Sequence, residues 1–269
     1  RAPSAGTGGG NLTLKSTASV LAAATTVATE SAGSLGDGGR VLLATSTADG
    51  SVPVTGNARL ALDAGSMIDV SGQGAGDAGS VKVRAPRLGA GAGNDVAIDR
   101  LDAHVTGAAE IVAEAFRVYA GVTTLTTGTG AGSTLGFTKL ANDTAAFMSV
   151  TNVNAIKSRL GKSADATLHL RPGIEVRSQG DLALQSDWNL FSASRPGGEP
   201  GVLTLRAGGN LNLVGTLNDG FSSTTPVRSD ADYRGGSSYS YRLVAGADAE
   251  AADLLAVSAT AAALGSGNL

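Results

Sequence analysis

The sequence predicts an all-β fold in which short strands wind into stacked coils, that is, a solenoid. One short phrase recurs along the chain, glycine is frequent between the expected strands, and the apolar residues are mostly aliphatic. The chain has 39 glycines, and 42% of its residues are hydrophobic while only 4% are aromatic. The core is therefore expected to consist of Leu, Val, Ile and Ala. We expect residues 1–269 to form a single solenoid segment of a longer protein.

The recurring phrase joins a glycine and a polar residue to a triplet whose first and third residues are apolar. Side chains alternate between the two sides of a strand, so these two apolar residues share one face. Corners between flat faces need unusual φ angles, which glycine adopts most readily. Asn11 and Asn210 stand at matching positions, and we expect them to stack and to bond through their amides. The phrase occurs as GGNLTL (9–14), GGRVLL (38–43), QGDLAL (179–184) and GGNLNL (208–213).

A longer unit contains two triplets with a corner between them. It occurs as LALDAGSMIDVSG (60–72), LHLRPGIEVRSQG (168–180) and LTLRAGGNLNLVG (203–215). Leu60 and Val81 are 21 residues apart, and so are Leu182 and Leu203. This spacing suits a solenoid coil made of two or three short strands. A tight hairpin is not favoured, because the triplets are short and the corners lack an Asn-Gly or Asp-Gly pair. We therefore expect Leu203–Leu205 and Leu211–Leu213 to lie on successive faces rather than antiparallel to each other.

Two segments depart from this rhythm and still predict regular structure. GAAEIVAEAFRVYAG (107–121) is rich in Ala and Glu, but apolar residues occur on both of its alternating faces, which predicts a buried strand. The segment 141–161 has apolar residues at helical spacing, with Asn142 or Asp143 as the N-cap and Gly161 as the stop. It predicts one amphipathic helix inserted into the solenoid.

Two further segments have less regular patterns. Ser, Gly and charged residues dominate 222–242, which predicts a long loop excursion. The segment 249–264 is compatible with a helix by propensity and also with the irregular end of the solenoid. The sequence does not decide between these two structures.

The composition argues against several classes of partner. The chain has 20 Lys and Arg against 23 Asp and Glu, a net charge of -3, which is not the footprint of a protein that binds nucleic acid or anionic membranes. No apolar run approaches the roughly 18 residues of a membrane-spanning helix, so stable membrane insertion is not expected. Because cysteine is absent, thiolate metal sites and disulfides are excluded.

Few residues have the pattern of a catalytic or metal site. Asp102 and His104 are spaced to share one side of a strand as an acid–base pair, but this spacing often arises by chance and no nucleophile accompanies it. His169 lies between two leucines and is expected to face solvent, and two histidines without cysteine do not favour a zinc or iron site. The glycine-rich stretches with Asp77 and Asp95 lack the tandem repetition of calcium-binding nonapeptides and are interpreted as loops.

An enzyme with this fold would need carboxylates gathered on one outer face. Glu175 and Asp187 are candidates to meet across coils, but a solvated position is favoured for both. Trp188, with Asn189 and Phe191, is a candidate to stack on a sugar ring, although a lone Trp beside a leucine more often packs in the core. The other acidic residues are dispersed along the chain: Asp63, Asp69, Asp77, Asp181 and Asp219. The sequence therefore assigns no catalytic, cofactor-binding or metal-ligating residue, and it leaves the ligand-binding residues unknown.

Several distinct phrases occur in an order that resembles the large bacterial exoproteins of the filamentous haemagglutinin family. They cover about residues 38–250 and include VTGAAEIVAEAFRVY (105–119), AAFMSVTNVNAIKSRLG (145–161), DLALQSDWNL (181–190), PGVLTLRAGGNLNLVGTLNDGF (200–221) and SYSYRLVAGAD (238–248). The resemblance implies a right-handed parallel β-helix, here an interior shaft segment of a fibre exported by two-partner secretion. Tyr239 departs from the family, which has Trp at that position.

The resemblance implies a secreted or cell-surface protein of adhesion and virulence rather than an enzyme, with no catalytic residue or cofactor to transfer. The expected partners are an outer-membrane transporter, which acts on a region outside this segment, and a glycan or protein on a host or bacterial surface. We expect a structural shaft and adhesion segment whose main recognition elements are 141–161 and 222–242. The alternatives are a β-helical carbohydrate-active enzyme, a polysaccharide lyase or hydrolase, and an inert spacer of a toxin-delivery fibre.

Overall fold

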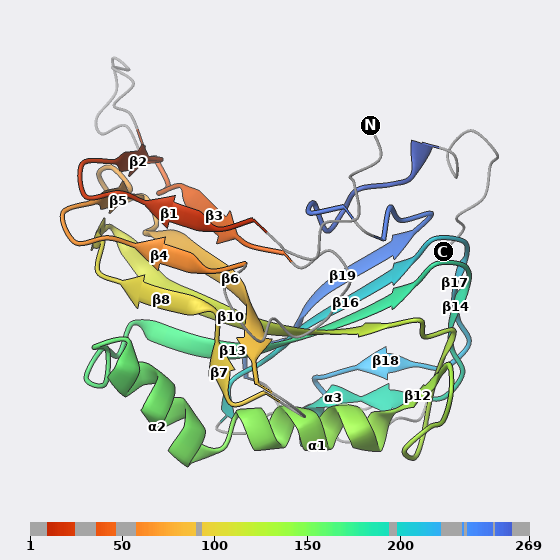
Figure 1. Ribbon diagram of the computed structural model, residues 1–269. Coiled ribbons are helices and arrows are strands. Elements are labelled where there is room, and N and C mark those ends of the chain that lie inside the picture. Colours follow the sequence, from red (N-terminus) through yellow and green to blue (C-terminus); the bar gives the residue numbers. More distant parts are fainter. Residues whose placement is uncertain are drawn as a thin grey trace.

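The protein is mostly β, and its strands pair in parallel (Figure 1). The computed structural model describes residues 10–24, 36–46, 58–89, 93–193, 198–221, 233, 236–249 and 251–259. Among the strands of these residues, the only antiparallel pair is formed by β7 (Asp95–Val96) with the end of β6 (Gly79–Leu88). No helix in this part of the chain has the length and hydropathy needed to cross a membrane.

One large curved sheet organises the molecule. Its strands follow the order β19-β16-β13-β10-β6-β3, so each strand pairs in parallel with the next main strand along the chain. The chain must therefore return to the same end of the sheet between successive strands. The six main strands are β3 (Arg40–Ala44), β6, β10 (Ala108–Ala120), β13 (Leu168–Ser178), β16 (Val202–Ala207) and β19 (Ser240–Ala245).

Two groups of short strands lie at opposite ends of the main strands (Figure 1). The first group precedes its main strands and comprises β1 (Leu12–Leu14), β2 (Ser19–Leu21), β4 (Leu60–Leu62), β5 (Met67–Asp69), β8 (Ile98–Leu101) and β9 (His104–Thr106). The second group follows its main strands and comprises β11 (Thr124–Thr126), β12 (Thr134–Gly136), β14 (Leu182–Leu184), β15 (Trp188–Asn189), β17 (Leu211–Leu213) and β18 (Leu217–Asn218). The long strands β6, β10 and β13 connect the two groups, because β3 pairs with the first half of β6 and β16 with the second half of β13.

The two triplets of LTLRAGGNLNLVG lie in different sheets, as predicted. Leu203–Leu205 belong to β16 of the main sheet, whereas Leu211–Leu213 form β17, which pairs in parallel with β14. Leu203, Leu205 and Leu211 are buried. The glycine-containing run between them is therefore a corner and not a hairpin turn.

The prediction of a corner in LHLRPGIEVRSQG is wrong, because this segment forms the single strand β13. Pro172 is tolerated inside the sheet because β16 pairs with β13 only from Gly173 onwards, so one side of Pro172 needs no ladder hydrogen bond. Gly173 leaves room for the neighbouring strand, since an added Cβ would lie 2.7 Å from the Cβ of Phe116. The Pro-Gly pair thus marks the point where β16 begins to pair with β13 and where Phe116 of β10 lies close to the backbone of β13. It does not mark a bend.

The 21-residue spacing does not match the observed register. Leu60 and Val81 lie in β4 and β6, which belong to different sheets, and the same holds for Leu182 and Leu203. Equivalent positions are separated by 29 residues in the second group, where Leu182 pairs with Leu211. The 21-residue spacing therefore connects strands of two different sheets and not equivalent positions of one sheet.

The segment 107–121 forms the strand β10, as predicted, but the single helix predicted over 141–161 is wrong. Two helices occur instead, α1 (Phe137–Phe147) and α2 (Val150–Arg159). Asn142 and Asp143 lie inside α1, and the Ser149 hydroxyl caps α2 by accepting a hydrogen bond from the Asn152 backbone N–H. Gly161, with φ of +66°, follows the last helical residues as expected.

The break between the helices allows both to cover the apolar side of the sheet. Leu140 of α1 packs with the core residues of the second group, whereas Phe147, Ile156 and Leu160 pack with those of the first. The helix α1 thus reaches both cores, and α2 extends the cover over the first core. The short helix α3 (Leu190–Ala193) begins directly after β15.

The predicted loop over 222–242 is only partly described. Residues 222–232 and 234–235 lie outside the described residues, and 240–242 belong to β19, so the loop ends earlier than predicted. In the segment 249–264, residues 251–258 form turns and a bridge between Ala247 and Val257 rather than a helix. Residues 250 and 260–264 lie outside the described part.

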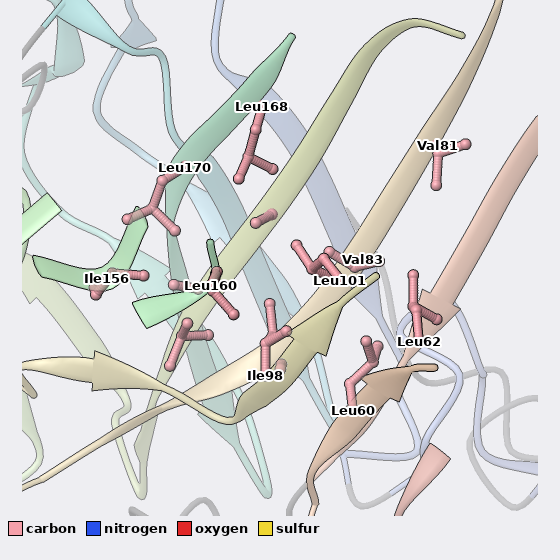
Figure 2. Close-up of a cluster of buried hydrophobic side chains, with 14 of the residues drawn as sticks. Leu60, Leu62, Val81, Val83, Ile98, Leu101, Ile156, Leu160, Leu168 and Leu170 are labelled. Atoms are coloured by element: carbon pink, nitrogen blue, oxygen red, sulfur yellow. The ribbon is translucent and has the colours of Figure 1, made fainter. Parts of the chain in front are cut away.

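Both apolar cores lie on the same face of the main sheet. In the first core, leucine and isoleucine side chains from β4 and β8 meet Val81 and Val83 of β6, Leu168 and Leu170 of β13, and Ile156 and Leu160 from the α2 region (Figure 2). The second core contains Leu125, Leu184 and Trp188 together with leucines of β16 and β17. The core is thus largely aliphatic, as the composition predicted.

Asp and Asn side chains link segments that are far apart in the sequence. In each case a side-chain oxygen accepts a hydrogen bond from a backbone N–H of a segment later in the chain. Four such bonds join Asn11 to Arg59 N (2.9 Å), Asp37 to Asp77 N (3.0 Å), Asp181 to Asn210 N (2.7 Å) and Asp187 to Thr216 N (2.7 Å). The predicted Asn11–Asn210 stack is wrong, because these residues belong to different groups of coils and each bonds within its own group.

Replacing Asp187 with Ala should lower the free energy of unfolding by about 1 kcal/mol, because Thr216 N–H loses its acceptor at the corner. Asp187→Asn keeps an acceptor oxygen at the same place and should retain most of the stability. Urea unfolding followed by the fluorescence of the single Trp measures both. Equal stabilities of the Ala and Asn variants would contradict a capping role.

Candidate functional site

The face of the main sheet opposite the apolar cores carries a buried layer of charges. Arg84 of β6, Glu114 of β10, Glu175 of β13 and Arg206 of β16 are all at most 1% exposed. They stand at positions that alternate with core residues such as Val83 and Leu205, and therefore point to the other side of the sheet. Both faces of this sheet are thus buried, one apolar and one charged.

Two carboxylates hold this layer together, and we call the residues that they join the charged cluster. Arg84 donates to Glu114 over 2.9 Å and to Glu175 over 2.6 Å, so it bridges both acids. Glu175 also accepts from Arg177 at 2.7 Å and from Arg206 at 3.3 Å. The charged cluster is completed by Arg242 of β19, which forms an ion pair with Glu114 at 3.0 Å.

The Arg242–Glu114 pair shows that the sheet curls towards its charged face. Two strands, β16 and β13, separate β19 from β10 in the sheet order. In a flat sheet, three strand spacings alone would place them about 14 Å apart. The register also sets Arg242 level with Val118 rather than with Glu114, so the two side chains would not meet in a flat sheet. The charged cluster therefore fills the concave side of a curled sheet.

The surroundings of the two carboxylates keep them ionised. Burial alone would raise the pKa of Glu175, but Arg84, Arg177 and Arg206 outweigh it and hold the pKa below its ordinary value. For Glu114, burial is likewise outweighed by Arg242, Arg84 and Lys82, and its pKa is also lowered. Four guanidinium groups thus share two carboxylates.

Backbone carbonyl oxygens provide further acceptors for the arginines, which outnumber the carboxylates of the charged cluster. Arg206 donates to the carbonyl oxygens of Asp248, Ala251 (3.3 Å) and Asp253 (3.2 Å). Burial lowers the pKa of Arg206, and the attraction of Glu175 opposes this shift. Arg206 therefore helps to hold the segment that follows β19 over the charged face, together with the backbone hydrogen bonds of Gly246 and Ala247 to Gly209 and Ala207.

The concave face opens at the amino-terminal ends of the strands into a groove of about 580 Å³. Arg40 and Leu42 of β3 line it together with Ser240 of β19, so both edge strands of the curled sheet contribute. We call this hollow the mouth groove. Its polar lining also includes Ser80, Lys82, Glu110 and Arg171.

Lys82 is the central cation of the mouth groove. It is half-buried, and burial lowers its pKa, while Glu114 raises it and Arg242 lowers it further. Within the described part of the chain, neither Lys82 nor Arg40 has a carboxylate within ion-pair distance. Arg171, by contrast, is already paired with Glu110 at 2.7 Å and with Glu199 at 3.3 Å. The mouth groove therefore contains two cations that are available to an incoming group.

The two histidines lie in different surroundings. Asp102 and His104 are both exposed, with no hydrogen bond between them in the described structure. His169 was expected to face solvent but is half-buried, with its Nδ1 2.7 Å from a Glu199 carboxylate oxygen. The described residues contain no group of three or more His, Asp or Glu placed to hold a metal ion.

Glu175 and Asp187 are not brought together. Glu175 is buried in the charged cluster, so the expectation that it is solvated is wrong. Asp187 is exposed and binds Thr216 N–H at a corner. The buried position arises because the opposite face of β13 is covered by the curl of the sheet, which one strand by itself does not reveal.

The remaining acidic candidates have local structural roles. Arg100 and Lys15 form ion pairs with Asp63, the Ser71 hydroxyl and N–H bind Asp69, and Arg159 pairs with Asp95. Asp219 accepts a hydrogen bond from the backbone of Tyr239. These carboxylates do not converge on one another.

Trp188 packs in the core, which confirms the favoured interpretation. It is 3% exposed, and its ring stacks on Phe137 with centroids 4.7 Å apart and planes 7° from parallel. Asn189 donates to the Phe221 carbonyl and accepts from Phe191 N–H. Trp188 therefore presents no open face to a sugar ring.

The charged cluster is the main feature that the sequence interpretation missed. The signal was present, because Arg84, Glu114 and Arg171 occupy aligned positions on three neighbouring strands. Each of them alternates with small or branched apolar residues in its strand. Charged residues at such positions, repeated in several strands, indicate a second buried face.

Comparison of the chain with protein-family models, curated proteins and solved structures finds no match.

Proposed function

We propose that this chain is a segment of a right-handed parallel β-helix that serves as the shaft and adhesion surface of a large secreted bacterial surface protein. The observation that carries the proposal is the parallel pairing of each main strand with the next one along the chain. Such pairing extends a rigid body in one direction and leaves its loops free for recognition. The order of sequence phrases shared with the filamentous haemagglutinin family supports the same role.

The proposal assigns binding without turnover. The partners are a glycan or protein on a host or bacterial surface and, through a region outside this segment, an outer-membrane transporter of the two-partner route. The helices α1 and α2 serve mainly to close the apolar cores, since Phe147, Ile156 and Leu160 are buried. The mouth groove is therefore a stronger candidate for recognition than the helical insertion.

A surface-binding experiment distinguishes this role from the alternatives. Fluorescently labelled protein should bind epithelial or bacterial cells saturably, and incubation with extracted surface polysaccharides should release no new reducing ends or unsaturated products. Cleavage that depends on one carboxylate would replace the adhesin proposal with a β-helical lyase or hydrolase. Absence of saturable binding would instead favour an inert spacer of a toxin-delivery fibre.

A further inference from the structure

We propose that the mouth groove binds a single carboxylate-bearing sugar unit, a hexuronic or a sialic acid, with Lys82 and Arg40 as its cationic contacts. The inference deepens the proposed adhesion function, because it names the class of ligand and the place where it binds. Nothing in the chemistry of the groove requires the sugar to be cleaved.

The position of Lys82 is the first argument. A half-buried ammonium group without a close carboxylate is less well solvated than one in water, and an anion brought to it offsets that loss. The charges that act on the pKa of Lys82 are two acids, Glu114 and Glu110, and two arginines, Arg242 and Arg171, so neither sign dominates. A ligand carboxylate would add the missing direct partner.

The second argument is the pairing state of the other cations. Arg171 is engaged by Glu110 and Glu199, but Arg40 is exposed and has no ion pair within the described residues. A guanidinium group can hold a carboxylate through two parallel hydrogen bonds. Arg40 lies beside Ser80 on the neighbouring strand, two residues from the position level with Lys82, so both cations line the same groove and can contact one carboxylate.

The acidic and hydroxyl groups of the rim select among anions. Asp37, Asp77, Ser80 and Ser240 line the same groove and can exchange hydrogen bonds with sugar hydroxyls. The same carboxylates would repel a chain that carries a charge on every residue, such as a heavily sulfated polysaccharide or an acidic peptide. One negative charge surrounded by hydroxyls fits this lining best.

The experiment measures binding of defined monosaccharides to the intact chain by calorimetry or by ligand-observed NMR. The probes are the methyl glycosides of glucuronic acid and N-acetylneuraminic acid. The methyl glycoside of glucose is the neutral comparison, and glucose 6-sulfate tests for a sulfate ligand. We expect saturable binding of at least one carboxylated probe and none of the neutral sugar, with affinity falling as salt is added.

Lys82→Met should weaken this binding by about tenfold or more, because a charge-assisted contact is lost. Arg40→Gln should weaken it by a smaller factor, and Lys82→Arg should restore most of it. The matched control is Lys157→Met, which removes the same charge from α2, the helix whose Ile156 packs on the opposite, apolar face of the sheet. Thermal unfolding of each variant verifies that the fold is retained.

Several results would overturn the inference: no carboxylated probe binds, Lys82→Met and Lys157→Met bind equally well, or glucose 6-sulfate binds more tightly than both acids. These results are separable from a failure of the adhesion proposal. If cells are bound saturably by the Lys82→Met variant as well as by the wild type, adhesion stands and the groove is not its site. If the sugar binds but no cell surface does, the groove stands and the adhesion role falls.

Discussion

Glu175→Gln should lower the free energy of unfolding by about 3–5 kcal/mol, the largest effect expected of any single charge in this chain. Glu175 is the shared partner of Arg84, Arg177 and Arg206, with nitrogen–oxygen distances of 2.6, 2.7 and 3.3 Å. The glutamine side chain keeps the volume but leaves these buried guanidinium groups with less negative charge. Urea unfolding monitored by the fluorescence of the single Trp gives the stability directly.

The matched control is Glu110→Gln on the same side of the sheet. The Glu110 side chain is 37% exposed in its ion pair with Arg171, and a solvent-screened pair contributes at most about 1 kcal/mol. The difference between the two variants therefore isolates the effect of burial. Similar losses in both would show that the charged cluster is not the stabilising feature described above.

The same carboxylates predict how stability depends on pH. The pKa values of Glu114 and Glu175 are lower in the folded state than the roughly 4.3 of an unfolded glutamate. Folding is therefore favoured by the ionised form, and this contribution is fully present above the unfolded pKa. It is lost as the pH falls from the unfolded pKa through the folded pKa, because over this range the unfolded chain binds protons that the folded carboxylates do not yet bind.

An acid titration of the unfolding free energy tests this linkage. The wild type should lose stability from about pH 4 downwards, and Glu175→Gln should show a shallower loss because one of the two titrating groups is gone. A variant curve that runs parallel to the wild-type curve across this range would contradict the assignment.

Trp188→Ala should lower the free energy of unfolding by about 3–5 kcal/mol, since it removes a large buried side chain from the second core. The indole packs face to face on Phe137, which lies at the first residue of α1. Loss of the indole would therefore also loosen the contact between α1 and the short strands of the second group. Circular dichroism during thermal unfolding is the suitable measurement, because the variant has no tryptophan left to report fluorescence.

Trp188→Phe provides the control, as it keeps an aromatic ring for the stack and should retain much of the stability. The wild-type indole should also be poorly accessible to acrylamide, and its emission should not change when sugars are added. Strong quenching, or a Trp188→Ala loss below about 1 kcal/mol, would place the residue at the surface instead.

The strands that the sequence predicted correctly have a local pattern. In β16 and β17 the apolar residues alternate over three positions, and the corner between them needs only glycine. The strand β10 was also predictable, since both of its faces carry apolar residues. These properties follow from the geometry of an extended chain and need no partner for their interpretation.

The errors occur where a distant segment changes the meaning of a local pattern. Pro172 and Gly173 signal a turn, yet they lie within β13 because β16 begins to pair only at that point and Phe116 occupies the space above the glycine. The residues 141–161 have a helical pattern, but α1 already starts at Phe137 and ends at Phe147, where Phe147 and Met148 pack into the first core, and α2 starts separately after Ser149. Neither outcome is visible within the segment itself.

The mouth groove lay beyond sequence interpretation for the same reason. Lys82 and Ser240 are far apart in the chain and belong to strands separated by three others in the sheet. They line one groove only because the sheet curls. No spacing or motif in the sequence encodes this proximity.

The sequence by itself determined that the fold is mostly β, that the core is aliphatic and that the run between Leu205 and Leu211 is a corner, because alternating side chains and glycine act within a few residues. Only the tertiary structure decided that the second face of the main sheet is buried and charged. Arg242 reaches Glu114 across 128 residues of sequence, and that contact exists only once the intervening strands have paired and curled. Burial of a charge is a property of everything that surrounds it, and what surrounds Glu114 and Glu175 is assembled from segments across the whole chain.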